Sequence, residues 1–165
     1  MTALPAAGRR ETDRVVGVAI FLGATTMLFA AFLLAYAVLR AEAPAWPPVG
    51  TPPFPRAAAG ANTLLLLAAT LCLRAGRARA ALALGAGFVV VQALLWRHLV
   101  AAHLGPGAGL MGDVFFALSA LHALHVLAGL VALAAVRARR PRAVTLYWDF
   151  VLGVWIVIFL AVCVL

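Results

Sequence analysis

VVGVAIFLGATTMLFAAFLLAYAVL, residues 15–39, is a run of 25 residues without a charged side chain. About 20 predominantly apolar residues are enough for an α-helix to cross the hydrocarbon core of a bilayer. The run is too long for the apolar region of a cleavable signal peptide, which spans roughly 7–15 residues. It therefore predicts a retained transmembrane helix over residues 15–39.

Four further apolar runs follow, at about 58–73, 78–95, 112–136 and 143–165. Their apolar residues are continuous rather than alternating, which argues against the strands of a transmembrane barrel. In lipid, a helix satisfies all its backbone polar groups within its own segment. With 66% hydrophobic residues and a mean hydropathy of +1.09, the chain is predicted to be an all-α membrane protein. We expect a single domain over residues 1–165, made of five transmembrane helices.

Arginine supplies all thirteen basic residues, and it is unevenly distributed between the apolar runs. Ten arginines lie before the first run, after the second and after the fourth; three lie on the opposite side. The positive-inside rule then predicts a cytoplasmic N-terminus and a C-terminus outside, in the periplasm. Topology thus accounts for the net charge of +8, and no nucleic-acid partner is expected. The ten are Arg9, Arg10, Arg14, Arg74, Arg77, Arg79, Arg137, Arg139, Arg140 and Arg142; the three are Arg40, Arg56 and Arg97.

The first outer connection is rich in proline. Residues 41–58 hold six prolines, and Trp46 is followed directly by Pro47 and Pro48. Proline-rich chain is stiff and extended. Tryptophan favours the membrane–water interface, so we expect Trp46 to lie there.

A small number of polar side chains fall inside the apolar runs. Polar groups at membrane depth are costly and generally face protein or water rather than lipid. The sequence therefore predicts a polar seam, either inside the bundle or against a partner. Its candidates are Thr25, Thr26, Asn62, Thr63, Gln92, Ser119, His122, His125 and Asp149.

His122 and His125, three residues apart, share one face of the fourth predicted helix. Haem or zinc binding would need further ligands at the same depth, and the other histidines, His98 and His103, lie at the outer boundary. A proton route would need a chain of acids and imidazoles through the bilayer, but we expect Asp149 to be the single acid at membrane depth. These two interpretations stay open, and a structural role in joining helices is favoured.

Asp149 lies near the cytoplasmic start of the fifth predicted helix. The helix dipole favours a negative charge there, and Arg140 and Arg142 are nearby in the sequence. We therefore predict an anchor at the cytoplasmic end rather than a catalytic acid. The sequence contains no CxxC pair, phosphate-binding glycine loop or nucleophile–base arrangement, so no catalytic residue is predicted.

Five ordered motifs together resemble subunit III of the haem–copper oxidases, the cytochrome c oxidase polypeptide III family. The histidine stretch FFALSALHALHVLAG (115–129) is similar to the family's Phe-Phe…His-Gly-Leu-His-Val…Gly pattern. The last helix opens on YWDFVLGVW (147–155), where the family has Tyr-Trp-His-Phe-Val-Asp-x-Val-Trp. The other matches are FLGATTMLFAAFLLAYAVLR (21–40), WPPVG (46–50) with the later Asn62-Thr63, and LGAGFVVVQ (84–92).

The resemblance implies an accessory subunit of a terminal oxidase, in the short five-helix form, in the bacterial inner membrane. It implies packing on the catalytic subunit I, with subunit II and a small subunit IV as further partners, and support for stability and proton uptake. The chain itself would bind no haem or copper, which belong to the partner subunits, while membrane phospholipid would bind between its helices. The residues that carry these expectations are Trp46, Pro47, Pro48, Asn62, Gln92, His122, His125, Gly129, Tyr147, Trp148, Asp149 and Trp155.

The chain departs from the family pattern at several polar positions. Thr25 stands where the family has a glutamate, and Asp149 and Leu152 stand where it has His and Asp. Any role of that glutamate is therefore absent here. Two alternatives remain open at this point, namely a similar accessory protein of a nitric oxide reductase and a small membrane assembly factor.

Overall fold

The computed structural model describes residues 6–47, 54–107, 109–135 and 142–164, and every regular element within them is helical. All five α-helices are long and apolar enough to cross a membrane, the last together with a short π-helical continuation. This confirms the predicted all-helical fold with five helices of spanning length. The elements are α1 (Ala6–Glu42), α2 (Arg56–Arg74), α3 (Ala78–Ala101), α4 (Leu110–Ala135), α5 (Arg142–Ile158) and the π-helical segment (Phe159–Val164).

The helices extend beyond the apolar runs that predicted them. α1 begins at Ala6 rather than at residue 15, and α3 continues to Ala101 rather than ending near residue 95. The added residues are largely Ala, Arg and Glu, which are good helix formers although some of them are charged. The apolar runs therefore predicted the apolar part of each helix. Residues with a high helix propensity extend the helices beyond those runs.

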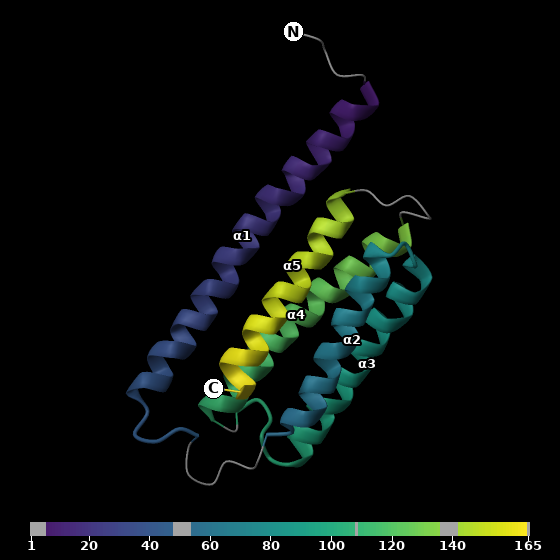
Figure 1. Ribbon diagram of the computed structural model, residues 1–165. Coiled ribbons are helices and arrows are strands. Elements are labelled where there is room, and N and C mark those ends of the chain that lie inside the picture. The colour runs from purple at the N-terminus through teal and green to yellow at the C-terminus, as the bar shows by residue number, and fades with distance from the viewer. Residues whose placement is uncertain (1–5, 48–53, 108, 136–141, 165) are drawn as a thin grey trace.

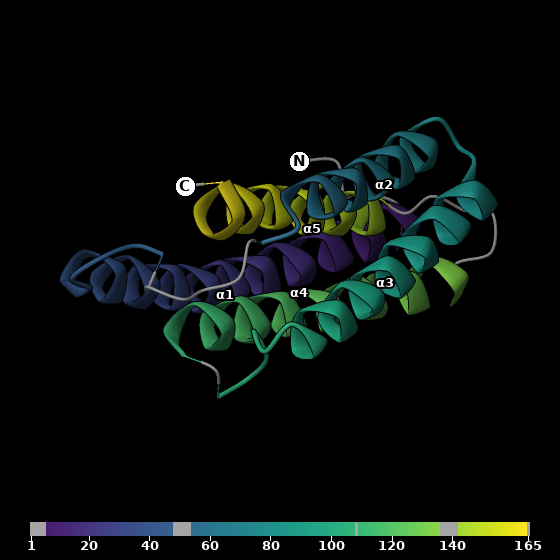
Figure 2. The ribbon, with the colours of Figure 1, turned by 90° about the horizontal axis from the view of Figure 1, so that it is seen from below.

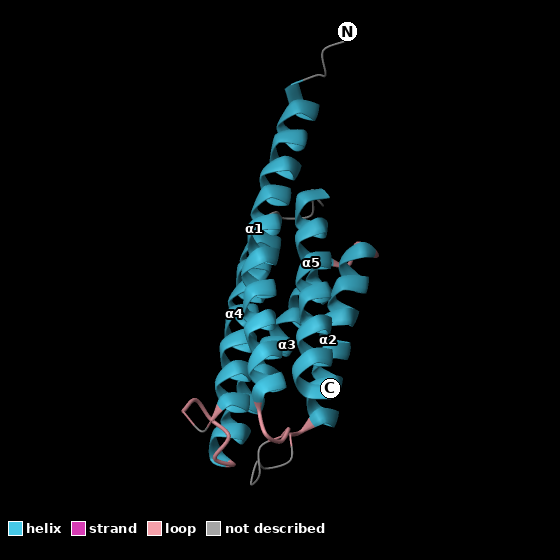
Figure 3. Cartoon of the chain, turned by 90° about the vertical axis from the view of Figure 1, so that its left-hand side faces the viewer, coloured by secondary structure: helices cyan, strands magenta, loops and turns pink. Residues whose placement is uncertain are grey.

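The helices run side by side in alternating directions (Figure 1). The start of α1, the α2–α3 turn and the start of α5 lie at one end of the molecule, and the α1–α2 and α3–α4 connections lie at the other. The first turns of α1 project beyond the neighbouring helices (Figure 3). The two arginine-rich segments described by the structure, at the start of α1 and around the α2–α3 turn, therefore share one end.

A tight turn joins α2 to α3. Gly76 has a φ of +84°, and the Arg77 amide donates to the Cys72 carbonyl at 2.8 Å across the end of α2. This is the usual C-terminal cap in which glycine takes the left-handed position at little cost. Because the turn is short, α2 and α3 are antiparallel neighbours with an extensive shared interface.

The core lies between α2, α3, α4 and α5, which we call the four-helix group. Its largest fully buried side chains are Trp148 and Trp155 of α5, Phe88 of α3 and Phe115 of α4. α1 packs on the outside of this group, against α5 and α4 (Figure 2). The candidate polar residues are therefore concentrated in the four-helix group, with α1 covering one side.

Candidate functional site

Three side-chain hydrogen bonds connect the four-helix group from one helix to the next. The Trp155 indole N–H of α5 donates to the Thr63 hydroxyl of α2 at 3.0 Å. The Asn62 amide of α2 donates to the Gln92 Oε1 of α3 at 3.1 Å. We call these residues, together with Trp96 and Ser119, the polar belt.

The third link of the polar belt joins α3 to α4. The Trp96 indole N–H donates to the Ser119 hydroxyl at 2.9 Å, and Ser119 in turn donates to the Phe115 carbonyl of its own helix at 2.6 Å. Asn62, Gln92 and Ser119 are almost completely buried. Polar side chains that would be costly in lipid therefore bond to one another inside the bundle, while the Asn62 Oδ1 and the Gln92 Nε2 have no partner among the described residues.

His122 lies inside the bundle, where three aromatic rings pack on it. Its side chain is 1% exposed, and its ring centroid lies 5.0 Å from that of Trp155 and 5.9 Å from that of Phe88. The ring centroid of Phe29 of α1 lies 6.4 Å away. Neither ring nitrogen has a hydrogen-bond partner among the described residues. His122 thus links α4 to α5, α3 and α1 through ring contacts.

His125 lies one turn further along α4 and is half-buried. Its Nδ1 is 2.8 Å from the Leu121 carbonyl, and Phe29 and Phe21 of α1 pack on its ring at 5.4 and 6.3 Å between centroids. The Tyr147 hydroxyl of α5 donates to the His125 backbone carbonyl at 2.8 Å. This histidine therefore lies where α1, α4 and α5 meet.

Gly85 and Gly129 form the two sides of a socket for the aromatic pair at the start of α5. A Cβ on Gly85 would lie 2.8 Å from the Trp148 ring, and a Cβ on Gly129 would lie 2.9 Å from the Tyr147 ring. Real Cβ atoms do not approach other atoms this closely, so glycine is required for the packing as it stands. Gly129 was among the residues named from the family resemblance, whereas the sequence did not single out Gly85.

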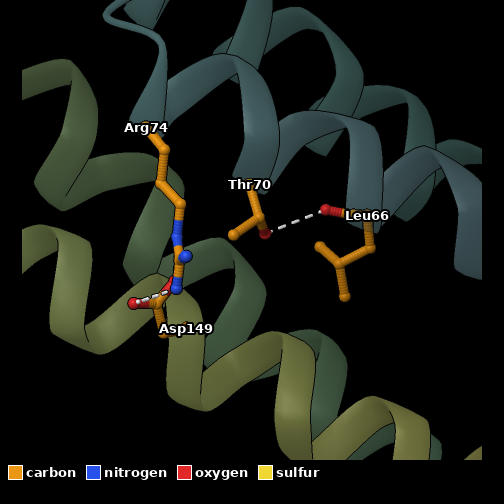
Figure 4. Close-up of polar contacts among 4 residues, drawn as sticks. All are labelled: Leu66, Thr70, Arg74 and Asp149. Carbon is orange, nitrogen blue, oxygen red and sulfur yellow. Dashed lines mark hydrogen bonds and ion pairs between the residues drawn. The ribbon is translucent and has the colours of Figure 1, made fainter.

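Asp149 forms an ion pair with Arg74, the last residue of α2 (Figure 4). The Arg74 Nη2 lies 2.9 Å from the Asp149 Oδ2, and the Arg74 Nε donates to the Oδ1 at 3.1 Å. The sequence pointed instead to Arg140 or Arg142. Arg140 lies outside the described residues, and Arg142 lies two turns before Asp149, about 10.5 Å away along the helix axis. The pairing with Arg74 arises because the end of α2 and the start of α5 lie at the same end of the molecule.

The opposite end of α1 carries a second aromatic arrangement. Trp46 packs on Tyr36 at 5.6 Å, and the Arg40 guanidinium lies 5.6 Å from the centre of the Trp46 ring. A cavity of about 470 Å³ opens beside them, between α1 and the end of α5. Pro47 follows Trp46 at the surface, and Pro48 lies outside the described residues. The cavity is lined by Leu33, Tyr36, Ala37, Arg40, Ala41, Trp46, Val157 and Ala161.

Thr25 is the residue that the resemblance places at a glutamate position of the family. It is buried, and its hydroxyl donates to the Phe21 carbonyl of its own helix at 2.9 Å. Thr26 does the same with the Leu22 carbonyl at 2.7 Å. The hydroxyls of both threonines are thus satisfied within α1.

The described part of the chain contains no group of three or more His, Cys, Asp or Glu side chains arranged to hold a metal ion. His98 and His103 are exposed at the far end of α3, away from the aromatic packing of His122. The named residues make contacts between helices, namely hydrogen bonds, ring packing and close approaches at glycine.

Two residues that make these contacts were not predicted from the sequence. Trp96 was not singled out, although a buried indole N–H generally needs an acceptor and Ser119 was already a candidate. Gly85 was one of many small residues in the helices, and its contacts with Trp148 and Leu130 distinguish it from Gly87, which has open space around it.

No family model matches the chain. A curated relative does: the cytochrome c oxidase subunit 3 of Synechocystis sp. is 32% identical over 179 aligned positions. The alignment covers 92% of this chain and 76% of the relative. Together with five helices of spanning length, this similarity identifies a multi-pass membrane protein. The chain belongs to the cytochrome c oxidase subunit 3 family.

Proposed function

We propose that this chain is the accessory subunit III of a haem–copper terminal oxidase in the aerobic respiratory chain of a bacterial inner membrane. The observation that carries the proposal is the similarity to a cytochrome c oxidase subunit 3 along 92% of the chain. The candidate residues support it, because His122, Gly129, Trp148 and Trp155 all contribute to helix packing.

In this role the chain acts as a preformed helical support and carries no redox centre. Haem and copper belong to the partner subunits I and II, and a small subunit IV completes the assembly. Packing on subunit I stabilises the complex and supports proton uptake during O2 reduction. The polar belt favours such a role, because its members bond to each other within the membrane span and leave the four-helix group firmly joined.

We also propose that the N-terminus lies in the cytoplasm and the C-terminus in the periplasm. Ten of thirteen arginines lie near the start of α1 or in and beside the connections that would share its side of the membrane. An excess of arginine marks the cytoplasmic side of membrane proteins. Topology reporters fused after residue 75 and after residue 106 test this: the first should report cytoplasm and the second periplasm.

Membrane phospholipid is the ligand expected at the cavity beside Trp46. Its walls are mostly apolar and suit acyl chains, while Arg40 supplies a positive charge at the end of α1, where head groups lie. The Trp46 ring at the same level is typical of the membrane–water interface.

Purification of the tagged chain from its native membrane in mild detergent tests the proposed function. We expect a haem–copper subunit to co-purify, with haem absorbance in proportion to the chain. Recovery of the chain without any haem–copper subunit would contradict the proposal and favour an assembly factor. Recovery with a nitric oxide reductase would assign it to that enzyme instead.

A further inference from the structure

His125 lies at the edge of the buried face of α4, on the side that meets α1. Its neighbours on the same helix change from buried to exposed there: His122 and Gly129 are buried, whereas Leu124 and Ala128 are exposed. The two α1 rings that flank it differ in the same way, because Phe29 is buried and Phe21 is exposed. The imidazole therefore lies at the boundary between the bundle and its surroundings.

One nitrogen of His125 has its partner within the chain. A carbonyl oxygen only accepts hydrogen bonds, so the contact of 2.8 Å with the Leu121 carbonyl places a proton on Nδ1. In the neutral imidazole, Nε2 is then an acceptor. No hydrogen bond to Nε2 occurs among the residues that the structure describes. The side chain thus presents an unused acceptor at the α1–α4 boundary.

The depth of His125 restricts what can satisfy this acceptor. His125 lies fifteen residues after the start of α4 and ten before its end, so the nearer helix end is about 15 Å away along the axis. The hydrocarbon core of a bilayer is about 30 Å thick, which places His125 near its middle. Acyl chains offer no donor, and lipid head groups and bulk water lie at the surfaces. A side chain of another membrane protein is the source that fits this depth.

We propose that the α1–α4 face around His125 is the docking surface for a transmembrane helix of a partner oxidase subunit, which donates a hydrogen bond to the His125 Nε2. This inference rests on the proposed function. The surface consists of Phe21, Leu28 and Phe32 of α1 with Leu124, His125 and Ala128 of α4. The three α1 residues are seven and four positions apart and share one helix face. The small side chain of Ala128, one turn from His125, allows a partner backbone to approach closely.

The first test places a photo-reactive amino acid at Leu124 in the complex in its native membrane. Leu64 of α2 is the matched control, because it is exposed to a similar extent, 64% against 62%, and lies at a similar depth in its helix. We expect cross-links from position 124 to the haem-bearing subunit and none from position 64. Cross-links to that subunit from position 64 but to lipid alone from position 124 would overturn the docking surface while leaving the proposed function intact.

The second test removes the acceptor and keeps the ring shape, with the substitution His125→Phe. The substitution His125→Gln restores an acceptor at the same place and serves as the matched control. Hydrogen bonds between membrane helices correspond to about a 3- to 20-fold change in affinity. We expect His125→Phe to reduce retention of the chain on the partner subunits by that factor during detergent titration, and His125→Gln to recover part of it.

Equal retention of wild type, His125→Phe and His125→Gln would overturn the proposed hydrogen bond. Fluorescence from Trp148 and Trp155, which lie in the core of the four-helix group, verifies in each case that the variant is folded. If the wild-type chain itself co-purifies with no oxidase subunit, the proposed function fails and the docking surface fails with it. The two failures are therefore distinguishable.

Discussion

α1 and the four-helix group are held by different interactions. The four-helix group is joined by the hydrogen bonds of the polar belt and by glycine sockets around Trp148. The hydroxyls of Thr25 and Thr26 of α1 bond to their own helix, and the rings Phe21 and Phe29 pack on the two histidines. In the most apolar stretch of α1 only 17% of residues are buried, against 39% in α4.

This difference separates two roles within a small membrane protein. Some helices hold the fold together, and another is left to contact its surroundings. Hydrogen bonds and close packing hold helices together where lipid supplies no hydrophobic driving force. A helix with a small buried share, such as α1, leaves most of its surface for lipid or for other proteins. α1 is therefore the helix most dependent on its surroundings, and the four-helix group is the part most able to keep its structure alone.

The largest effect is expected from breaking the socket of the four-helix group. Gly85→Leu inserts a side chain where even a Cβ would lie 2.8 Å from the buried Trp148 ring. We expect a loss of about 3 kcal/mol in the free energy of unfolding, the upper part of the usual range for overpacking. The measurement is unfolding in mixed micelles with increasing SDS, followed by tryptophan fluorescence. Gly87→Leu, on the same helix but with open space around it, should leave the transition within about 0.5 kcal/mol of wild type.

The next effect concerns the polar belt. Asn62→Leu leaves the buried Gln92 amide without its partner from α2 and should cost about 1–2 kcal/mol. The double substitution Asn62→Leu with Gln92→Leu removes both polar groups and should cost less than the single one, since no buried amide remains unpaired. The same SDS titration measures both. A double variant less stable than Asn62→Leu alone would contradict this expectation. It would mean that the unpaired Gln92 amide is not the main cost of the single substitution.

A smaller effect, confined to α1, is expected from Phe29→Leu. The substitution removes the ring contacts with His122 and His125, which are worth about 0.5–1.5 kcal/mol. Hydrogen–deuterium exchange of the isolated chain should become faster in α1 and stay unchanged in α2–α5. Phe32→Leu, an exposed position of the same helix, is the control and should have no effect. Faster exchange throughout the chain would mean that α1 and the four-helix group open together.

The smallest effect is expected at the Arg74–Asp149 ion pair, whose side chains are 59% and 32% exposed. Exposed pairs contribute about 0–1 kcal/mol, and screening by salt reduces this further. A double-mutant cycle with Arg74→Gln and Asp149→Asn should give a coupling of about 0.5 kcal/mol or less that disappears at high salt. A coupling unaffected by salt would instead make this pair part of the rigid framework of the four-helix group.

Much of the fold could be predicted because membrane spans are a local property of the sequence. The continuous apolar runs identified all five helices, and the errors lay at their ends, where charged residues such as Glu11 and Arg14 continue a helix without contributing hydropathy. The candidate residues could be named from the five motifs. Their partners could not, as Asp149 shows: its partner Arg74 is 75 positions away in the sequence.

The sequence by itself determined that five helices of spanning length form, which polar residues lie within them, and that arginine gathers in particular connections. The tertiary structure decided which of those polar residues meet, that Gly85 is a socket while Gly87 is open, and that His125 lies at an edge while His122 is enclosed. The physical reason is that successive helical residues point about 100° apart. A contact therefore depends on the rotation and depth of two helices at once, and an apolar run specifies neither.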